Sequence, residues 1–578
     1  MKRYWKYIKP YLSAFIIGPI LMIIEVIGEV VMPLLLSNII DQGITGGRGI
    51  AYIIMMGIIM AITALIMMTG GVGGAYFAIK ASTGFANDLR KDMFYKIQKF
   101  SFTNIDQYHT GSLITRLTND ITQVQSLLQM SLRLALRAPG MLIGALIMAF
   151  RLNSQLALTI LCIIPLLAIA LLVIMKVAFP RFTKMQQKLD ALNTTTQENL
   201  INIRVVKSFV RERFEEEKFK KANLDLKDST INAMKVVIFT MPIMTMAMNL
   251  TTLAVVWFGG NQVIIGNMTA GVLTAFVNYV VQILMSLMMV SMIILHSTRS
   301  FASFKRIDEV LTTEIDLSDD DAAHKELTVK HGKVEFKGVH FKYYKNSDKW
   351  VLEDINLVIN PGETVGVIGS TGSGKSSLVQ LIPRLYDVDQ GEVLVDDINV
   401  KDYNLKHLRD GVGIVLQKNV LFSGTIKENL KWGDENATDE EVCKWAEAAQ
   451  AHGFITSFEK GYETELEQGG VNVSGGQKQR LCIARTLLKK PKILILDDST
   501  SAVDTATEAR IRESFHNELK GTTKIIIAQR ISSVINADKI IVLDNGKITG
   551  IGTHTELLES CTAYSEIYYS QMDKKETA

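Results

Sequence analysis

Cysteine is scarce in this sequence, and so is any excess of charge of one sign. The four cysteines lie far apart and lack the CxxC or Cys/His spacing of a metal site, so we expect reduced thiols that serve as small apolar side chains. The formal net charge is only +3, and no block of lysine and arginine forms a basic stripe. Nucleic acid is therefore set aside as a partner.

The N-terminus has no short apolar segment that ends in a small-residue cleavage site, as a signal peptide would. It starts instead with four basic residues, Lys2, Arg3, Lys6 and Lys9, and then becomes apolar. Hydrophobic residues make up 48% of the chain and charged residues 21%, which predicts that the two kinds are segregated along it. We expect the N-terminus to lie at a membrane interface and to lead into a retained membrane helix.

Long apolar stretches fill the first half of the chain, and each can cross about 30 Å of hydrocarbon as a helix. They cover residues 11–40, 51–79, 127–150, 155–179, 235–265 and 270–295. Lysine and arginine are dense in 80–125 and 180–235 and sparse in 41–50 and 259–271, so both termini are expected in the cytoplasm. The sequence predicts a multi-pass protein of the cell (plasma) membrane with six spans.

The two connections on the cytoplasmic side carry helical periodicity with few Pro or Gly breaks, so they read as membrane helices that continue beyond the bilayer. Short reversals are expected near 101–113 and 205–213, where a second domain could grip the tips. The alternative is a pair of solvated charged hairpins.

Two features inside the spans predict helix contacts. Glu25 and Glu29 lie one turn apart in the first span, where carboxylates are costly, so they are expected to face a cavity or a polar partner. A role in binding cationic solutes stays open. Gly70 and Gly74 in the second span form a small-xxx-small face that predicts close packing against another helix.

The pattern changes after a polar, acidic linker. Short apolar strands now alternate with helices, which is typical of an α/β domain. The stretch VGVIGSTGSGKSSLVQLI at 365–382 predicts a strand, a GxxxxGK[ST] loop and a helix, whose backbone N–H groups can cradle nucleotide phosphates. The residues expected to hold ATP here are Gly369, Ser370, Thr371, Gly372, Ser373, Gly374, Lys375, Ser376 and Ser377. Lys375 would reach the β- and γ-phosphates, and Ser376 would ligate Mg²⁺.

Two further segments fit the same chemistry. The strand in ILILDDST, at 493–500, ends in Asp497, a carboxylate suited to the Mg²⁺ shell. The stretch NVSGGQKQRLCIARTL at 472–487 predicts a second helix whose N-terminus, at Ser474, Gly475 and Gly476, can hold an anion. One chain therefore carries two phosphate-seeking helix starts.

With these motifs, the chain resembles a half-transporter of the ABC exporter family over essentially its whole length. The resemblance implies a multidomain membrane protein: an all-α six-helix transmembrane domain over 1–312, a linker over 313–333, and an α/β P-loop ABC nucleotide-binding domain over 334–578. It implies ATP and Mg²⁺ as cofactors. In this family two nucleotide-binding domains pair head to tail, each ATP lying between the Walker A loop of one and the signature of the other. The chain is therefore expected to dimerise.

The resemblance also assigns individual roles. Tyr343 in VHFKY would stack on adenine, and Gln417 would be the Q-loop residue, close to the Mg²⁺. Asp504 in SAVD and Gln529 in IIIAQRISS occupy two further catalytic positions, the second being the switch position. The signature is SGGQ, formed by Ser474, Gly475, Gly476 and Gln477.

The sequence departs from the family pattern at the hydrolytic centre. Asp498 stands where the family has a catalytic Glu, and a carboxylate shorter by one methylene positions the attacking water poorly. Gln529 stands where the family has His, and an amide cannot carry a proton or a positive charge. Gln468 replaces a Glu ahead of the signature, whereas the signature itself is intact.

These departures predict the degenerate half of a heterodimeric exporter. The chain would hold ATP at its own Walker A loop without efficient turnover, and its signature would complete a competent site on a second, non-identical half-transporter. One alternative is a homodimeric exporter with two slow, equivalent sites, and another is a membrane sensor that binds ATP without transport. The cargo would be a hydrophobic or amphiphilic small molecule taken from the lipid bilayer or the cytoplasm.

Overall fold

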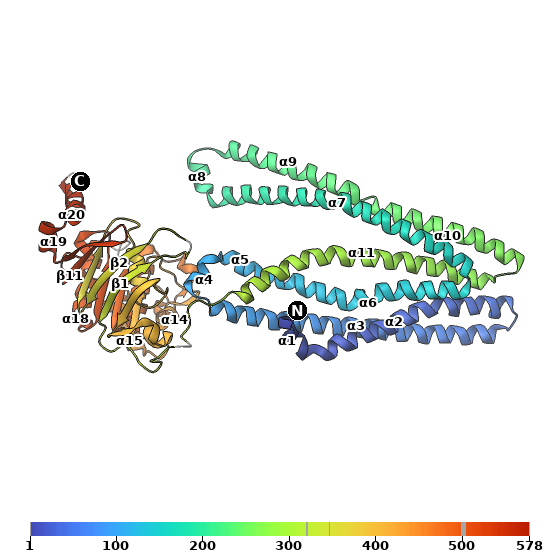
Figure 1. Cartoon of the computed structure of the whole chain (residues 1–578), viewed down its shortest axis with the longest axis horizontal. Helices are drawn as coiled ribbons and strands as arrows, with labels where there is room; N and C mark the ends of the chain where they lie inside the picture. Colours follow the sequence, from blue (N-terminus) through green and yellow to red (C-terminus); the bar gives the residue numbers. More distant parts are fainter. Residues whose placement is uncertain (1, 320–321, 346, 499–503, 577–578) are drawn as a thin grey trace. The chain divides into compact units, whose positions relative to one another are not determined.

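The structure is a computed structural model that describes residues 2–319, 322–345, 347–498 and 504–576. It consists of two compact units (Figure 1). The first is formed by Met1–Gln98 and Thr110–Thr312, and the second by Lys99–His109 and Thr313–Ala578. The predicted fold class, a helical membrane domain followed by an α/β nucleotide-binding domain, is confirmed.

Long helices make up the first unit. They are α2 Leu12–Asn38, α3 Ile50–Gln98, α6 Ile121–Leu152, α7 Ser154–Ile201, α9 Glu212–Val237, α10 Thr240–Ile265 and α11 Ala270–Thr312. The shorter pieces are α1 Trp5–Ile8, α5 Thr110–Thr115 and α8 Ile203–Ser208, with short π-helical turns at Ile39–Thr45 and Arg116–Asp120. The reversals predicted near 101–113 and 205–213 coincide with α4 (Phe102–Gln107) and α8.

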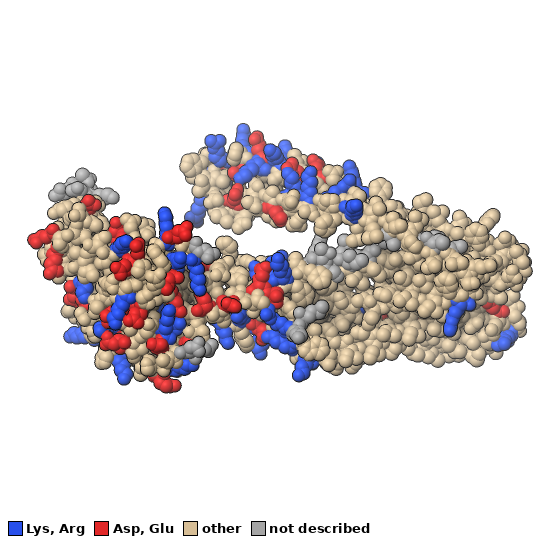
Figure 2. Space-filling model, in the orientation of Figure 1, with Lys and Arg blue, Asp and Glu red and all other residues tan. Residues whose placement is uncertain are grey.

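By length and hydropathy, five segments among the described residues can cross a membrane; they contain four of the six predicted spans and most of a fifth, 270–295. They are Trp5–Thr45, Ile50–Gln98, Thr110–Leu152, Glu212–Ile265 and Ala270–Val290. The remaining predicted span, 155–179, lies in α7, where several side chains fall outside the described residues. Figure 2 shows charged side chains gathered on the hairpin of α7 and α9 and sparse over much of the rest of this unit.

Helices α2 and α3 pack closely through the predicted glycine face. A Cβ added at Gly70 would lie 2.9 Å from the carbonyl oxygen of Leu21, and one at Gly74 would lie 2.9 Å from Cγ of Met22. A larger residue at Gly70 would push the two helices apart, and one at Gly74 would require the Met22 side chain or the helix itself to shift. The small-xxx-small prediction is therefore confirmed.

The two carboxylates inside the first span share one polar partner, Arg137 of α6. Arg137 Nη1 lies 3.1 Å from Glu25 Oε1, and Arg137 Nη2 pairs with Glu29 Oε1. Gln282 of α11 donates its side-chain amide to the backbone oxygen of Glu29 at 2.9 Å. The prediction of a polar partner is confirmed, and this cluster ties α2 to α6 and α11 across otherwise apolar surfaces.

The described residues of the second unit form three sheets. The central one is six-stranded, in the order β12-β11-β3-β10-β9-β6, and its strands are parallel except for β12. Its bounds are β3 Thr364–Ile368, β6 Val412–Val415, β9 Ile493–Asp497, β10 Thr523–Ile527, β11 Lys539–Asp544 and β12 Lys547–Gly552. Buried Val, Ile and Leu side chains dominate the five parallel strands, as expected for a parallel sheet covered on both faces, whereas the residues of β12 are half-buried or exposed.

An antiparallel sheet packs against the central one through a shared hydrophobic core. Its strands are β1 Val334–Phe341, β2 Leu352–Ile359, β4 Gln390–Val395 and β5 Ile398–Asn399, and the small third sheet pairs β7 Gly424–Thr425 with β8 Glu465–Leu466.

The helices of this unit are α4, α12 Lys375–Gln380, α13 Leu405–Gly411, α14 Ile426–Lys431, α15 Asp439–Ala448, α16 His452–Ser457, α17 Gly475–Leu488, α18 Thr505–Glu518, α19 His554–Ser560 and α20 Thr562–Glu576. Helices α14, α15, α17 and α18 surround a second core beside the strand pair β6 and β9.

The charged cluster in the first unit predicts a specific effect of substitution. Arg137→Met leaves two carboxylates without a counter-charge in an apolar environment, and breaking a buried pair in this way costs about 3–5 kcal/mol. We expect the apparent melting temperature of the detergent-solubilised chain to fall by several degrees, measured by the unfolding of its intrinsic fluorescence.

Two matched variants test the cause. Arg133→Met removes an exposed arginine one turn away on the same helix and should change the melting temperature little. Combining Arg137→Met with Glu25→Gln and Glu29→Gln removes all three charges and should recover most of the loss. A triple variant as unstable as Arg137→Met would show that packing, not charge, is responsible.

Candidate nucleotide-binding site

Four parallel strands place the predicted site residues along one edge of the central sheet. In β10, Ile527 pairs with Asp497 of β9 on one side and with Val367 of β3 on the other. Strand β6 continues the row, since Val415 pairs with Leu496. The carboxyl ends of all four strands therefore lie together, at the edge where open α/β sheets bind ligands. The Walker A loop, the two aspartates, the switch residue and the Q-loop residue all follow these ends.

The Walker A loop runs from β3 into α12, as predicted from its motif. Gly372 and Gly374 have φ values of 83° and 98°, a region that only glycine enters freely, so the loop can wrap with its N–H groups turned inward. Lys375 Nζ donates to the carbonyl oxygens of Gly369 at 2.9 Å and Ser370 at 2.7 Å. Burial lowers the pKa of Lys375, and the nearby charges of Asp497 and Asp498 oppose that shift.

The donor set of this loop fits a nucleotide with its metal ion. Ser373 Oγ is buried and has no hydrogen-bond partner in the described part of the chain. A Cβ at Gly374 would lie 2.8 Å from Cδ2 of Leu352, so the close wrapping of the loop depends on glycine. An unpaired hydroxyl and a lysine meet the backbone N–H groups at the start of α12 here, and phosphate oxygens would bind to them.

Asp497 and Ser376 form the pair expected to hold Mg²⁺. Ser376 Oγ donates to Asp497 Oδ1 at 3.0 Å, which brings a hydroxyl and a carboxylate oxygen together at the start of α12. Burial raises the pKa of Asp497, and the hydrogen bond from Ser376 partly opposes it. A hard cation that accepts oxygen ligands would relieve this cost of burying the carboxylate.

Asp498 is held by two side-chain amides. Gln529 Nε2 donates to Asp498 Oδ2 at 2.8 Å, and Gln417 Nε2 lies 3.5 Å from the same oxygen. The backbone of Asp498 has a φ of 48°, a left-handed conformation that aspartate tolerates better than most residues. Burial raises the pKa of Asp498, while the two amides oppose the rise. The structure thus brings together three of the residues predicted at the hydrolytic centre.

The signature segment forms a separate cluster at the start of α17. Ser474 is the N-cap of this helix: its Oγ accepts from the backbone of Gln477 at 3.3 Å, while Gln477 Oε1 accepts from the backbone of Ser474 at 2.9 Å. Gly475 and Gly476 form the first helical turn. Among the described contacts, no hydrogen bond joins these residues to the Walker A loop. A helix start of this kind suits a phosphate supplied from elsewhere.

Asp504 caps another helix. Its Oδ1 accepts from the backbone of Thr507 at 2.9 Å at the start of α18, and backbone hydrogen bonds hold the pKa of Asp504 below its ordinary value. The rest of SAVD, 501–503, lies outside the described residues, as do Ser499 and Thr500.

Tyr343, the residue expected to stack on adenine, lies at the end of an aromatic row. Its hydroxyl is hydrogen-bonded to Ser377 Oγ of α12 at 2.8 Å, and its ring meets Tyr386 edge-on at a centroid distance of 5.1 Å. Tyr386 OH in turn donates to Asp106 Oδ2 of α4 at 2.7 Å, and its ring packs against Phe102. Tyr343 is thereby connected to α4 through Tyr386.

Helix α4 is capped and anchored within this unit. Ser101 and Asn104 form a capping box at its start, and Asn104 Nδ2 donates to the carbonyl oxygen of Glu314 at 3.0 Å. Tyr108 OH is hydrogen-bonded to Thr313 Oγ1 at 2.8 Å. The first predicted tip is therefore attached both to residues 313–314 and to Tyr386.

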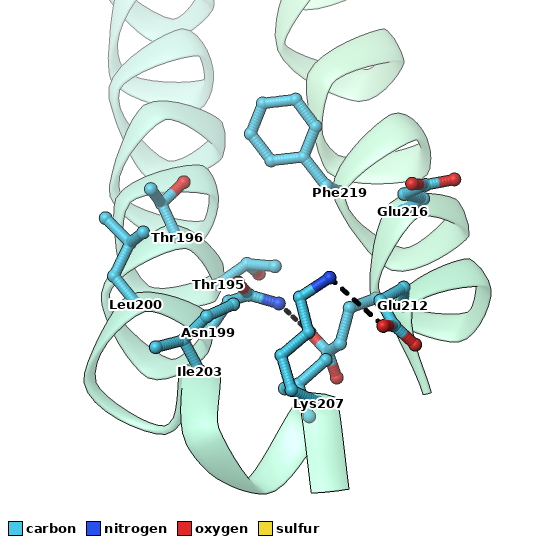
Figure 3. A pocket seen from close by; sticks show the side chains of 11 residues that line it. Thr195, Thr196, Asn199, Leu200, Ile203, Lys207, Glu212, Glu216 and Phe219 are labelled. Carbon is cyan, nitrogen blue, oxygen red and sulfur yellow. Dashed lines mark hydrogen bonds and ion pairs between the residues drawn. The ribbon is translucent and has the colours of Figure 1, made fainter. Parts of the chain in front are cut away.

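The second predicted tip, in the first unit, carries a small pocket between α7 and α9 (Figure 3). Its volume is about 310 Å³, and Figure 3 shows Thr195, Phe219 and Glu212 on its walls. Lys207 Nζ, in α8, pairs with Oε1 of Glu212, the first residue of α9, at 3.0 Å. These polar contacts close the hairpin and fix α8 at its end.

Sequence reasoning missed several residues that the structure places in or near the site. Tyr386 and Asp106 show no motif of their own, because their pairing joins positions 280 residues apart. Gln571, which contacts the switch segment, also lies outside every motif. Arg137, in the first unit, was detectable, since an arginine inside an apolar run needs a polar partner.

The comparisons with known proteins agree with this architecture. Residues 15–287 match the ABC transporter transmembrane region family, and residues 352–501 match the ABC transporter family. The chain is 40% identical over 575 residues to the uncharacterized ABC transporter ATP-binding protein YfiB of Bacillus subtilis (strain 168). That alignment covers 100% of this chain and 99% of the relative. It is 34% identical over 582 residues to the putative multidrug export ATP-binding/permease protein YgaD of the same organism, with 99% of each chain covered.

A solved structure of a bacterial Atm1-family ABC exporter with ATP bound superposes with a TM-score of 0.78 and 26% identity, covering 97% of this chain and 98% of that one. A helical membrane domain joined to a P-loop domain defines a membrane transporter driven by a nucleotide. The chain belongs to the ABC transporter family and has the fold of an exporter of the ATP-binding/permease type. Its second domain is an ATPase coupled to transport, with ATP and Mg²⁺ as cofactors.

Burial of the Asp497 carboxylate predicts the effect of neutralising it. A raised pKa means that the ionised form destabilises the folded state at neutral pH, and that this cost fades as the pH falls through the raised pKa towards the ordinary value of 3.8. Asp497→Asn should therefore raise the melting temperature of the nucleotide-free chain at neutral pH by about 2–4 °C, the effect of about 1 kcal/mol in a domain of this size.

The same variant should lose most of the further stabilisation that Mg²⁺-ATP gives the wild type, because the amide carries no charge for the cation. Differential scanning fluorimetry with and without Mg²⁺-ATP measures both effects. Glu435→Gln, an exposed acid-to-amide change, serves as the control and should alter neither. A nucleotide-free melting temperature below that of the wild type would contradict the argument.

Proposed function

We propose that this chain is the degenerate half of a heterodimeric ABC exporter. Its own site binds ATP and Mg²⁺ but hydrolyses ATP slowly, and its signature residues 474–477 complete the active site of a non-identical half-transporter. The observation that carries the proposal is the arrangement at Asp498, whose carboxylate is shared by the amides of Gln529 and Gln417. The intact, capped start of α17 supports the second part.

The physical argument concerns the groups that must prepare water for attack. A general base must reach the water and accept its proton, and Asp498 is shorter by one methylene than the glutamate of the family. A displacement of about 1 Å can cost about a hundredfold in rate. The neighbouring switch position offers the amide of Gln529, which neither takes up a proton nor gains positive charge. Two weakened groups act on the same step, whereas the phosphate-binding loop keeps all its donors.

The remaining site residues keep the roles that the family pattern implies. Tyr343 would stack on adenine, the loop 369–377 would hold the phosphates, and Lys375 would reach the β- and γ-phosphates. Ser376, Asp497 and Gln417 would surround the Mg²⁺, and the hydrogen bond between the first two supports this assignment. Asp504 would contribute from the start of α18, where it is already held as a helix cap.

The partner would be contacted through the second tip as well as through the nucleotide sites. Three apolar side chains at α8 and just beyond it, Val205, Phe209 and Val210, are 54%, 73% and 81% exposed. Helix α4, the first tip, packs Phe102 against Tyr386. Since an aromatic side chain of the first tip packs on a nucleotide-binding domain, we expect the second tip to do the same. The exposed Phe209 would enter an apolar cleft on the nucleotide-binding domain of the other half-transporter.

The cargo would be a hydrophobic or amphiphilic compound carried out of the cytoplasm or the inner leaflet of the plasma membrane. The apolar spans support this, and the relative named a putative multidrug export protein supports the same class of cargo. The nucleotide-binding domain and both termini would lie in the cytoplasm, as the distribution of lysine and arginine indicates.

The first test restores the two altered positions. The complex is purified from membranes of the native host through a tag on this chain, and the partner's Walker A lysine is replaced so that only this chain's site can turn over. Asp498→Glu combined with Gln529→His should then raise ATP hydrolysis at least tenfold. The longer glutamate can reach the attacking water, and the histidine can take up a proton and a positive charge.

Two controls accompany this measurement. Asp498→Asn should change the low basal rate less than twofold, since the native carboxylate contributes little. Ser474→Ala, measured with an intact partner, should reduce total turnover strongly, because the signature serves the partner's site. If the chain purified alone as a homodimer hydrolyses ATP vigorously, and Asp498→Asn abolishes that activity, the homodimeric alternative is correct.

The exposed second tip gives a separate prediction. Phe209→Ser should lower cargo-stimulated ATP hydrolysis of the complex roughly tenfold, because aromatic anchors carry much of the energy of an interface. Nucleotide binding should stay unchanged, since Phe209 lies on the tip of the membrane domain. The control is Leu224→Ser, another exposed apolar residue farther along α9. Equal effects of the two substitutions would contradict a specific role for the tip.

A further inference from the structure

The side chain of Gln571, in α20, bridges two backbone groups of the switch segment. Its Oε1 accepts from the backbone N–H of Ile531 at 2.9 Å, and its Nε2 donates to the carbonyl oxygen of Gln529 at 2.8 Å. These two groups flank Arg530, just beyond the end of β10, where sheet pairing has stopped. A primary amide holds an N–H donor and a carbonyl acceptor side by side. Gln571 therefore satisfies a backbone carbonyl and a backbone N–H that a neighbouring strand would otherwise pair with.

Helix α20 holds Gln571 in this position through a buried anchor. Tyr564 is fully buried, its hydroxyl is hydrogen-bonded to His554 Nδ1 at 2.7 Å, and it shares a hydrophobic cluster with Ile531. Ile567 packs against the same cluster. Positions 564, 567 and 571 fall on one face of a helix, because they are separated by three and four residues. The amide is therefore delivered to the switch segment by a helix that packs on that segment.

The contact reaches the nucleotide site through one residue. The backbone of Gln529 is held on its carbonyl side by Gln571, and its side chain donates to Asp498 Oδ2. On the other side the chain enters β10, where Ile527 is paired with Asp497. Because the backbone on both sides of Gln529 is held, its side-chain amide can point in only a few directions. In the structure it points at Asp498.

We infer that Gln571 is a positioning residue for the switch segment, and that α20 thereby controls where the Gln529 side chain lies in the nucleotide site. Release of Gln571 frees the carbonyl of Gln529 and the N–H of Ile531, so the Gln529 amide loses its fixed direction. The inference rests on the proposed role of Gln529 in two respects only: that it faces the γ-phosphate of ATP, and that it does so without a charge.

Hydrogen exchange on the purified complex, in the absence of nucleotide, tests the clamp itself. Gln571→Ala removes both hydrogen bonds and should accelerate exchange of the Ile531 amide roughly tenfold, as expected for the loss of a typical hydrogen bond. Gln571→Glu keeps an acceptor for that N–H but cannot donate to the carbonyl of Gln529, so Ile531 should stay largely protected. Ser570→Ala, an exposed neighbour, is the control and should change nothing.

Release rates of two nucleotides from this chain's own site test the consequence. Both Gln571→Ala and Gln571→Glu should speed the release of a fluorescent ATP analogue about fivefold to tenfold, because the switch contact to the γ-phosphate is disturbed. Release of the matching ADP analogue should stay within twofold, because ADP has no γ-phosphate. In a Gln529→Ala background the substitution of Gln571 should have no further effect on ATP release.

The outcomes separate three explanations. Unchanged exchange at Ile531 in Gln571→Ala would overturn the clamp. Equal acceleration of ATP and ADP release, or additive effects of Gln571→Ala and Gln529→Ala, would overturn the positioning role and leave α20 a purely structural element. If Gln529→Ala alone leaves ATP release unchanged, the proposed role of Gln529 fails, and with it the control of the site by α20.

Discussion

The parallel pairing of β6, β9, β10 and β3 is the constraint on which the nucleotide site depends. Each strand is short and apolar, and each ends where polar residues begin, so in-register pairing of Asp497, Ile527 and Val367 aligns the polar ends along one edge. Without that register, the lysine, the carboxylates and the two glutamines would be scattered over four loops.

Alignment at a sheet edge also sets an electrostatic problem, because the carboxylates following β9 are partly withdrawn from water. Burial raises the pKa of both Asp497 and Asp498, and the structure compensates each in a different way. Asp497 faces the hydroxyl of Ser376 and the loop that carries Lys375, where a bound cation would offset the cost of burying the carboxylate. Asp498 accepts hydrogen bonds from two amides, and the nearby charges of Lys375 and Arg530 add smaller contributions; all of these stabilise the carboxylate and make it a weaker base towards water. The proposed division between binding and hydrolysis follows from this difference.

Much of the site was predictable because its parts are local in sequence. The loop around Lys375 and the start of α17 at Ser474 are contiguous motifs in which backbone geometry, glycine and a helix start already define an anion site. The membrane domain was predictable for a similar reason, since length and hydropathy are properties of single segments. Contacts between distant positions were not predictable: no spacing rule pairs Tyr386 with Asp106, or Gln571 with Ile531.

The sequence by itself determined the order of the two domains, the apolar spans and the residue types offered to ATP, because periodicity and motifs act over short distances. Only the tertiary structure decided which groups meet. It pairs Arg137 with both Glu25 and Glu29, and it places the side-chain amide of Gln529 so that it donates to Asp498. The physical reason is that such contacts depend on strand register and helix packing, which are set by the whole hydrophobic core and not by any one segment.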